Sequence, residues 1–270
     1  MISMLVVHFN GELLHHKITL NAVPFSLMGV ALAIFLGFRN SASYDRYWEA
    51  RKLWGQLAIE CRNFARQIHS LELPGQLSVI QYLIAFVHTL RHQLRDSSAE
   101  VDWQRLLTQE DTEYLRTRQG PASALLLFIA KHLHDQKQSK HIDSFQWAHL
   151  DVTLNQLSNV LGGCERIANT PLPFTYSVIL HRTVYLYCML LPFGLLDGLG
   201  LMTPVMVTLV AYTFFAVEAL SDEIEEPFGM LANDLPLHAL SQGIEISVRE
   251  ILGQDIGDFE MIQPKEYLLH

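Results

Sequence analysis

Charged side chains are scarce in this sequence of 270 residues: they make up 17% of it, whereas hydrophobic side chains make up 50%. Soluble domains typically carry about 25% charged residues. The mean hydropathy of +0.17 agrees with this deficit. Because the apolar residues gather in a few runs, the composition favours a membrane protein with a substantial soluble part.

Cysteine and basic residues are also few. Cys61, Cys164 and Cys188 are odd in number, lie far apart and form no C-x-x-C pair, which argues against a disulfide framework or a structural zinc site. The net charge of -9 and a pI near 5.8 disfavour a nucleic-acid-binding protein.

Catalytic motifs are absent from the sequence as well. It contains neither a Gly-rich phosphate loop nor a G-x-S-x-G elbow, and no set of residues forms a catalytic constellation. We therefore predict that the chain is not an enzyme, has no catalytic residues and binds no cofactor.

Long uncharged runs are what the sequence does have. Residues 22–38 and 199–217 carry no charge, and residues 183–196 reach spanning length when extended back to Pro173. The polar pair Asp197-Gly198 predicts a tight break, so the last two runs indicate a transmembrane hairpin. The first nine residues are apolar but too short to span, and no cleavage site follows them. They are typical of the end of a truncated membrane helix, or alternatively of an interfacial segment.

The distribution of Lys and Arg predicts the orientation in the membrane. Of the 19 basic residues, 16 lie between Arg39 and Arg182, one is in the loop before residue 22, and none is in the 197–198 link. Since positive charge accumulates on the cytoplasmic side, residues after Arg39 and the C-terminus are expected inside, and the loop at residues 15–21 outside.

The region between the membrane runs has a helical pattern. Apolar residues recur at spacings of three and four within residues 54–68, 80–94 and 125–133, and loops are expected at residues 73–75 and 119–121. Residues 108–112 (TQEDT) predict a loop followed by a helix start. The predicted fold class is all-α, a transmembrane bundle continuous with a cytoplasmic helical bundle. Its parts are N-terminal membrane helices (1–38), a cytoplasmic helical domain (39–171), a transmembrane hairpin (172–220) and a cytoplasmic C-terminal segment (221–270).

One apolar stripe lies near the cytoplasmic end of the 22–38 run. Val30, Ile34 and Phe38 are four residues apart, which puts them on one helix face. On an oligomer axis they would form apolar rings of the kind that gate by dewetting. Alternatively, the stripe packs against neighbouring helices, as apolar stripes commonly do.

Three sequence motifs then indicate a family. They are residues 37–55 (GFRNSASYDRYWEARKLWG), residues 167–176 (IANTPLPFTY) with 181–185 (HRTVY), and residues 226–229 (EPFG) with 233–237 (NDLPL). In order and separation they closely resemble the bacterial branch of the bestrophin family, over most of the chain from about Pro24 to Leu252.

The resemblance implies a homopentameric ion channel in the bacterial inner membrane, with four membrane helices and a cytosolic helical domain in each subunit. It implies one axial pore with a hydrophobic neck, matched here at Val30, Ile34 and Phe38, and a cytosolic aperture, matched at Leu172. The expected partners are other copies of the chain, the lipid bilayer and permeating monovalent ions. The alternative is a membrane-anchored interaction protein without a conducting pore.

The sequence departs from the family pattern after the Pro-Phe-Gly turn. The animal members of the family that the chain resembles are calcium-activated anion channels and have an acidic run at this place. In this sequence, residues 230–234 (MLAND) contain a single acidic residue, Asp234, so we predict no calcium gating. The bacterial members of the family look like cation-conducting channels, so the anion selectivity of the animal members is not transferred to this chain. The acidic cluster of Asp222, Glu223, Glu225 and Glu226 suits cation attraction if it lines the pore, or is a solvated helix end.

Histidines supply the remaining candidates. His88 and His92 have the i, i+4 spacing of helical metal ligands but lack a zincin pattern, so we expect surface or interface histidines and no metal site. His181 and Arg182 near a span mark either an ion path or partners of carboxylates at a subunit interface.

Overall fold

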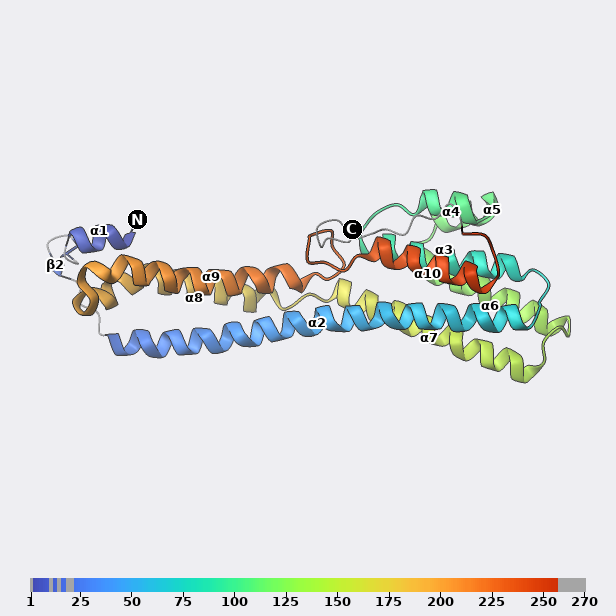
Figure 1. The fold of residues 1–270 in the computed structure, drawn as a ribbon, viewed down its shortest axis with the longest axis horizontal. Helices are drawn as coiled ribbons and strands as arrows, with labels where there is room; N and C mark the ends of the chain where they lie inside the picture. Colours follow the sequence, from blue (N-terminus) through green and yellow to red (C-terminus); the bar gives the residue numbers. More distant parts are fainter. Residues whose placement is uncertain (1, 10–11, 14–15, 18–21, 257–270) are drawn as a thin grey trace. The chain divides into compact units, whose positions relative to one another are not determined.

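The computed structural model describes residues 2–9, 12–13, 16–17 and 22–256, and its helical content confirms the predicted all-α class. The predicted outward loop at residues 15–21 lies outside this description apart from residues 16–17, as does the C-terminal segment from residue 257. Two short strands, β1 (Glu12–Leu13) and β2 (His16–Lys17), pair antiparallel. The helices are α1 (Ile2–His8), α2 (Ala22–Ser70), α3 (Gln76–Leu94), α4 (Glu100–Leu106), α5 (Gln109–Arg116), α6 (Pro121–Gln138), α7 (Ser144–Asn169), α8 (Phe174–Leu199), the 3₁₀ helix η1 (Gly200–Met202), α9 (Thr203–Glu225) and α10 (Leu237–Ile251) (Figure 1).

The chain divides into two compact units. The first comprises Met1–Tyr47 and Pro171–Glu226, and the second comprises Trp48–Thr170 and Pro227–His270. Helix α2 contributes its first half to one unit and its second half to the other.

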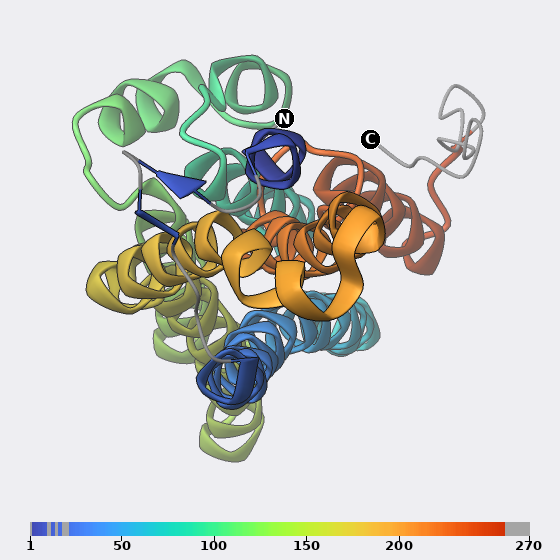
Figure 2. The same ribbon diagram turned by 90° about the vertical axis from the view of Figure 1, so that its left-hand side faces the viewer.

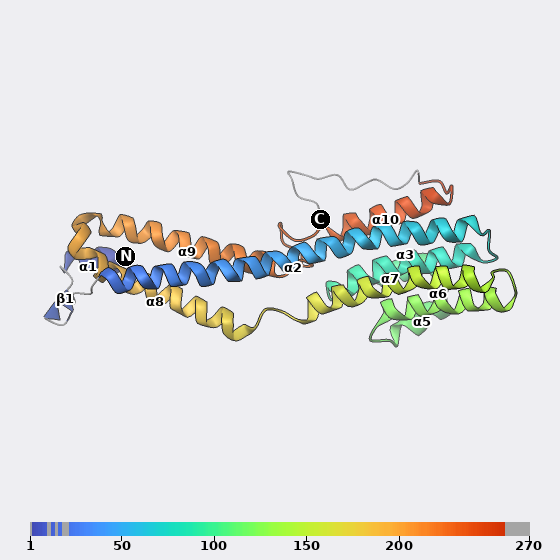
Figure 3. The same cartoon turned by 90° about the horizontal axis from the view of Figure 1, so that it is seen from below.

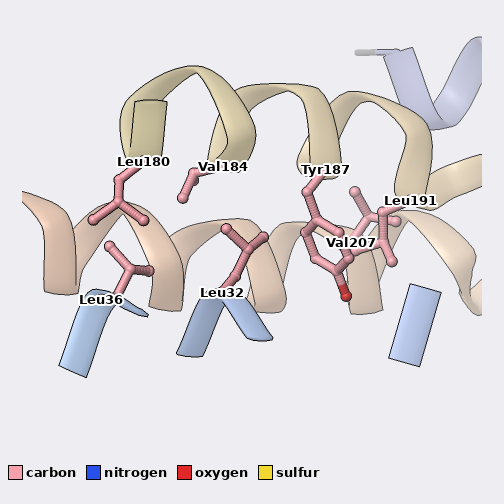
Figure 4. Close-up of a cluster of buried hydrophobic side chains, with 7 residues drawn as sticks. All are labelled: Leu32, Leu36, Leu180, Val184, Tyr187, Leu191 and Val207. Carbon is pink, nitrogen blue, oxygen red and sulfur yellow. The ribbon is translucent and has the colours of Figure 1, made fainter. Parts of the chain in front are cut away.

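The first unit consists of long helices running side by side. Helices α8 and α9 lie together with the first half of α2 beside them (Figures 1 and 3), and Figure 2 looks along these helices. Its apolar core joins Leu32 and Leu36 of α2 to residues of α8 and α9 (Figure 4). The other core residues are Leu180, Val184, Tyr187, Leu191 and Val207.

The stretches Val23–Ser70 and Phe174–Glu225 each contain a window long and apolar enough to cross a membrane. Only 22% and 11% of these windows are buried inside the chain. A core helix of a soluble protein would bury most of such a window, because exposing so much apolar surface to water is unfavourable.

The turn of the hairpin lies later than the sequence predicted. Helix α8 continues through Asp197 and Gly198 to Leu199, so the expected break at these two residues is wrong. The chain reverses at Gly200, the first residue of η1, whose φ of 50° is a conformation that glycine adopts at little cost.

The second unit packs α3 against α6 and α10, and α6 against α7. The predicted apolar stripe on α2 is confirmed, since all its members are buried: Trp54, Leu57, Cys61, Phe64 and Ile68. Cys164 of α7 is also buried, and burial raises the pKa of its thiol to about 12 and that of Cys61 even further above its ordinary value.

Local signals set the helix boundaries in this unit. The predicted start near residue 108 is confirmed, because Thr108 caps α5 by accepting a hydrogen bond from the amide of Asp111 at 3.2 Å. Asp143 and Gln146 form a reciprocal capping box at the start of α7. Pro121 occupies the first turn of α6, where its missing N–H costs nothing.

Candidate functional site

The stripe of Val30, Ile34 and Phe38 lies on the surface of the first half of α2. These side chains are 59%, 51% and 64% exposed in the single chain, whereas Leu32 and Leu36 of the same helix are buried in the core. Each residue advances the helix by about 100°, so Leu32 points some 200° away from Val30. The stripe therefore lies away from the core that joins α2 to α8 and α9 (Figure 4).

The apolar surface continues from the stripe toward the N-terminus of α2. Leu27 and Val23, one and two turns before Val30, are exposed as well. Such a length of uncovered apolar surface needs an apolar surrounding, which a lipid bilayer, a second subunit or a dewetted pore provides.

Leu172 lies in the short segment that connects α7 to α8. It stands between Pro171 and Pro173 and is half-buried. Neither proline has an N–H to donate, so this segment does not continue α7 as a helix. The structure thus puts Leu172 in a connection and the three stripe residues on a helix.

A buried cation follows the stripe directly. The guanidinium of Arg39 is buried and forms ion pairs with Asp222 and with Glu225 of α9, the latter at 3.3 Å. Arg46, two turns later, donates from Nε to the carbonyl oxygen of Glu225 at 3.2 Å. Helix α2 is therefore fixed to the end of α9 by charge-assisted hydrogen bonds just below Phe38.

These ion pairs bear on the acidic cluster at the end of α9. Two of its members, Asp222 and Glu225, face Arg39, so their charges are partly neutralised. Glu223 and Glu226 are not among the partners of Arg39. The cluster therefore has less unpaired negative charge than the four carboxylates in its sequence suggest.

A second polar pair lies within the hairpin. His181 Nδ1 of α8 is 2.6 Å from Oε1 of Glu218 on α9, and the Glu218 side chain is buried. The ring of Tyr185 packs against that of His181, with 4.5 Å between the ring centroids and a tilt of 52° between the ring planes. His181 therefore has a carboxylate partner in its own chain, whereas the sequence left open an ion path or a carboxylate partner at a subunit interface.

His88 and His92 belong to an ionic network in the second unit. His88 Nε2 lies 2.6 Å from Glu245 Oε2 on α10, and His92 Nε2 lies 3.2 Å from Asp102 Oδ2 on α4. Arg105 donates to both carboxylates, at 2.6 Å to Glu245 and 3.1 Å to Asp102. Within the described part of the chain, no group of three His, Cys, Asp or Glu is arranged to hold a metal ion.

The network keeps its two carboxylates ionised. Burial raises the pKa of Glu245, but hydrogen bonds from His88 and Arg105 outweigh it and hold that pKa far below its usual range. The pKa of Asp102 is likewise far below its usual range, because hydrogen bonds from His92 and Arg105 outweigh burial. The arrangement links α3, α4 and α10 and has a structural role.

Sequence reasoning overlooked the buried charges. From the sequence, Arg39 indicates the orientation and belongs to the motif of residues 37–55, and neither Glu218 nor Glu245 is singled out. The available signal was a charged residue on the apolar side of a helix pattern, as with Glu218 within a hydrophobic run, where a buried charge requires a partner.

Fold and site together describe an all-α membrane protein with an uncovered apolar stripe on its longest helix. A family model described as bacterial/fungal bestrophin protein matches residues 1–250. The chain belongs to the bestrophin family.

Relatives and solved structures agree with this assignment. The chain is 44% identical over 265 residues to a voltage-dependent anion channel-forming protein of Ralstonia nicotianae, covering 95% of this chain and 86% of the relative. It is 44% identical over 240 residues to the voltage-dependent anion channel-forming protein YneE of Escherichia coli, covering 88% and 79%. The crystal structure of a bestrophin homologue from Klebsiella pneumoniae matches with a TM-score of 0.90 at 40% identity, covering 94% of this chain and 96% of that one.

Proposed function

We propose that the chain forms a pentameric ion channel with a single axial pore. The observation that carries the proposal is the stripe of Val30, Ile34 and Phe38, which is apolar and uncovered in a chain whose relatives are named channel-forming proteins. Around a five-fold axis the three positions form the rings of a hydrophobic neck, and Leu172 forms a second ring at a cytosolic aperture. Apolar rings make pore width and ion dehydration the determinants of permeation.

The proposed channel lies in the bacterial inner membrane with its C-terminus in the cytoplasm. In this assignment residues 1–38 and 172–220 are the membrane parts, and residues 39–171 and 221–270 are cytoplasmic. The concentration of Lys and Arg between residues 39 and 182 supports this orientation. A reporter enzyme fused after residue 256 tests it: cytoplasmic activity is expected, and periplasmic activity would reverse the topology.

The proposed channel opens without calcium. Asp234 is the one carboxylate in the segment after the Pro-Phe-Gly turn, and its Oδ2 accepts a hydrogen bond from the amide of Leu231 at 2.6 Å. Calcium typically takes six to eight oxygen ligands, usually with several carboxylates, whereas here the charge of Arg95 interacts with that of Asp234. Currents are therefore expected to be equal in EGTA and in micromolar free calcium.

Current through the purified protein in a planar bilayer under a sodium chloride gradient tests the channel proposal. Phe38→Ala removes the bulkiest of the three stripe side chains and is expected to increase the current. Phe35→Ala is the matched control, since Phe35 is exposed on the same helix but points about 100° away from the mean direction of the stripe. Equal effects of the two substitutions would remove Phe38 from the neck.

The same recording assigns the permeating ion. A reversal potential near the chloride equilibrium value extends the anion-channel name of the relatives to this chain, and one near the sodium value assigns cations. If wild type and Phe38→Ala both carry no current while the oligomer is intact in the membrane, the chain is a membrane anchor for its helical domain and not a channel.

A further inference from the structure

The second unit contains a cavity that the proposed pore does not use. Its volume is about 420 Å³, within the range of roughly 300–1,000 Å³ that is usual for small-molecule sites. One wall comes from the C-terminal end of α3 and carries Arg91 and Arg95. The opposite wall comes from the segment between α9 and α10, and we call the space the Arg95 cavity.

Arg95 is held in place without an anionic hydrogen-bond partner. Its Nε donates to the carbonyl oxygen of Phe228 and its Nη2 to that of Leu235, both at 3.1 Å. Within the described part of the chain, Nη1 makes no hydrogen bond. Burial and the charge of Arg91 lower the pKa of Arg95, while Asp234 raises it, so the cation is only partly compensated.

Arg91 adds a second oriented cation. Its Nη2 donates to Asp102 at 2.9 Å, and its Nη1 lies 3.1 Å from the hydroxyl of Ser241 and 2.7 Å from Nδ1 of His238. Among the residues that line the cavity, two cations (Arg91 and Arg95) stand against one carboxylate (Asp234), in a chain whose net charge is -9. The cavity is thus much less repulsive to anions than the rest of the molecule.

The opposite wall carries three apolar side chains beside Asp234. Met230 and Leu231 are 75% and 64% exposed although both line the cavity, and the third, Leu235, is buried. A ligand with an apolar body would remove these side chains from water, which contributes about 25 cal/mol for each Å² buried. Guanidinium donors opposite an apolar surface favour a ligand that combines an anionic group with an apolar body.

We propose that the Arg95 cavity binds a small organic anion, with its carboxylate or phosphate on Nη1 of Arg95 and its apolar body against Met230, Leu231 and Leu235. Guanidinium groups bind these two anions with short, charge-assisted hydrogen bonds. The site includes residues of the segment that directly follows α9, so an occupied cavity braces that segment against α3.

Isothermal titration calorimetry of the full chain in nanodiscs of zwitterionic lipid tests the proposal, with phenyl phosphate as the probe. Phenol matches its body without the charge, and inorganic phosphate matches its charge without the body. Saturable binding of phenyl phosphate, at least about tenfold tighter than that of either control, is expected. No saturable heat from phenyl phosphate, or equal affinity for inorganic phosphate, would overturn the proposal.

Substitutions locate the binding site. Leu231→Glu puts a negative charge on an exposed position of the apolar wall and is expected to weaken phenyl phosphate binding about tenfold, while Leu231→Gln leaves it nearly unchanged. Arg95→Gln should abolish binding, and Arg66→Gln removes the same charge from an exposed position of α2 outside the cavity. Equal loss in Arg66→Gln and Arg95→Gln, or undiminished binding in Leu231→Glu, would contradict the assignment.

Discussion

The side chain of Arg39 connects two membrane helices, α2 and α9. It is buried immediately after Phe38, and it contacts two carboxylates of α9 that are 183 and 186 positions away in the chain. An ionised guanidinium removed from water is stable only with such partners, so its removal leaves two carboxylates without a counter-charge.

Arg39→Gln is expected to lower the stability of the first unit by about 2 kcal/mol. The loss is smaller than that of a fully buried pair, because Asp222 is 60% exposed and solvent screens its charge. Thermal unfolding of the detergent-solubilised protein should show a melting temperature lower by roughly 5 °C. Combining Arg39→Gln with Asp222→Asn and Glu225→Gln should recover part of the loss, and a melting temperature unaffected by Arg39→Gln would show that the pair is dispensable.

The sequence did not predict which side chains of different helices contact one another. The pattern of small spacings located the stripe of Val30, Ile34 and Phe38, because helix geometry alone decides which residues share a face. The contact of Arg39 with α9, and that of His181 with Glu218, depend on how separate helices pack, and no local pattern encodes them.

At the scale of elements, α10 docks on α3 through both charge and apolar contact. His238 lies near Arg91 in this interface, and the pKa of His238 is lowered by burial and by the charges of Arg91 and His88. A base whose folded pKa lies below its unfolded value binds fewer protons when folded. Its contribution to stability is therefore present above about pH 6.5 and lost as the pH falls through the folded pKa.

We expect acid to loosen α10 through His238. Amide hydrogen exchange in α10, measured relative to the intrinsic exchange rate at each pH, should accelerate between pH 7 and about pH 5, before Glu245 and Asp102 are protonated, because their pKa values lie far below the usual range. His238→Asn retains an acceptor for Arg91 but cannot be protonated, so its exchange should change less over the same interval. The same acceleration in both proteins would assign the effect to another group.

Gly194 of α8 allows the close approach of α2. A Cβ built on Gly194 would lie 2.7 Å from Cδ2 of Phe25, whereas one built on Gly55 of α2 meets nothing within 4 Å. Gly194→Val is expected to destabilise the first unit by about 1–3 kcal/mol through overpacking. Gly55→Ala should be neutral or stabilising by up to about 1 kcal/mol, since alanine favours a helix. Thermal unfolding of both variants measures the difference, and an unperturbed Gly194→Val would show that Phe25 can move aside.

The helices and the loop at residues 73–75 were predicted correctly, whereas the hairpin turn was not. The apolar periodicity of residues 54–68, 80–94 and 125–133 located α2, α3 and α6, because burial follows the helical repeat. The hairpin turn was placed two residues early, at Asp197-Gly198. Neither residue must leave a helix, and the position that adopts the left-handed conformation is Gly200.

For the whole molecule, the decisive quantity is the number of chains in the assembly. Native mass spectrometry of the protein released from nanodiscs is expected to show five copies of the 30.8 kDa chain. The exposed apolar faces of the first half of α2 favour association in the membrane. Leu27→Arg, on the same face as Val30, should reduce the assembly to smaller species, and a monomer as the main wild-type species would refute the pentamer.

Because two of the three thiols are buried, the chain should react little with cysteine reagents. Cys61 and Cys164 are shielded from solvent and resist ionisation, so reagents that need a thiolate leave them unmodified. Replacing half-buried Cys188 with serine would leave a background against which a cysteine introduced at residue 30, 34 or 38 is the one reactive group. The rate at which a charged thiosulfonate blocks current at each of these positions would then map water along the proposed conduction path, one helical turn at a time.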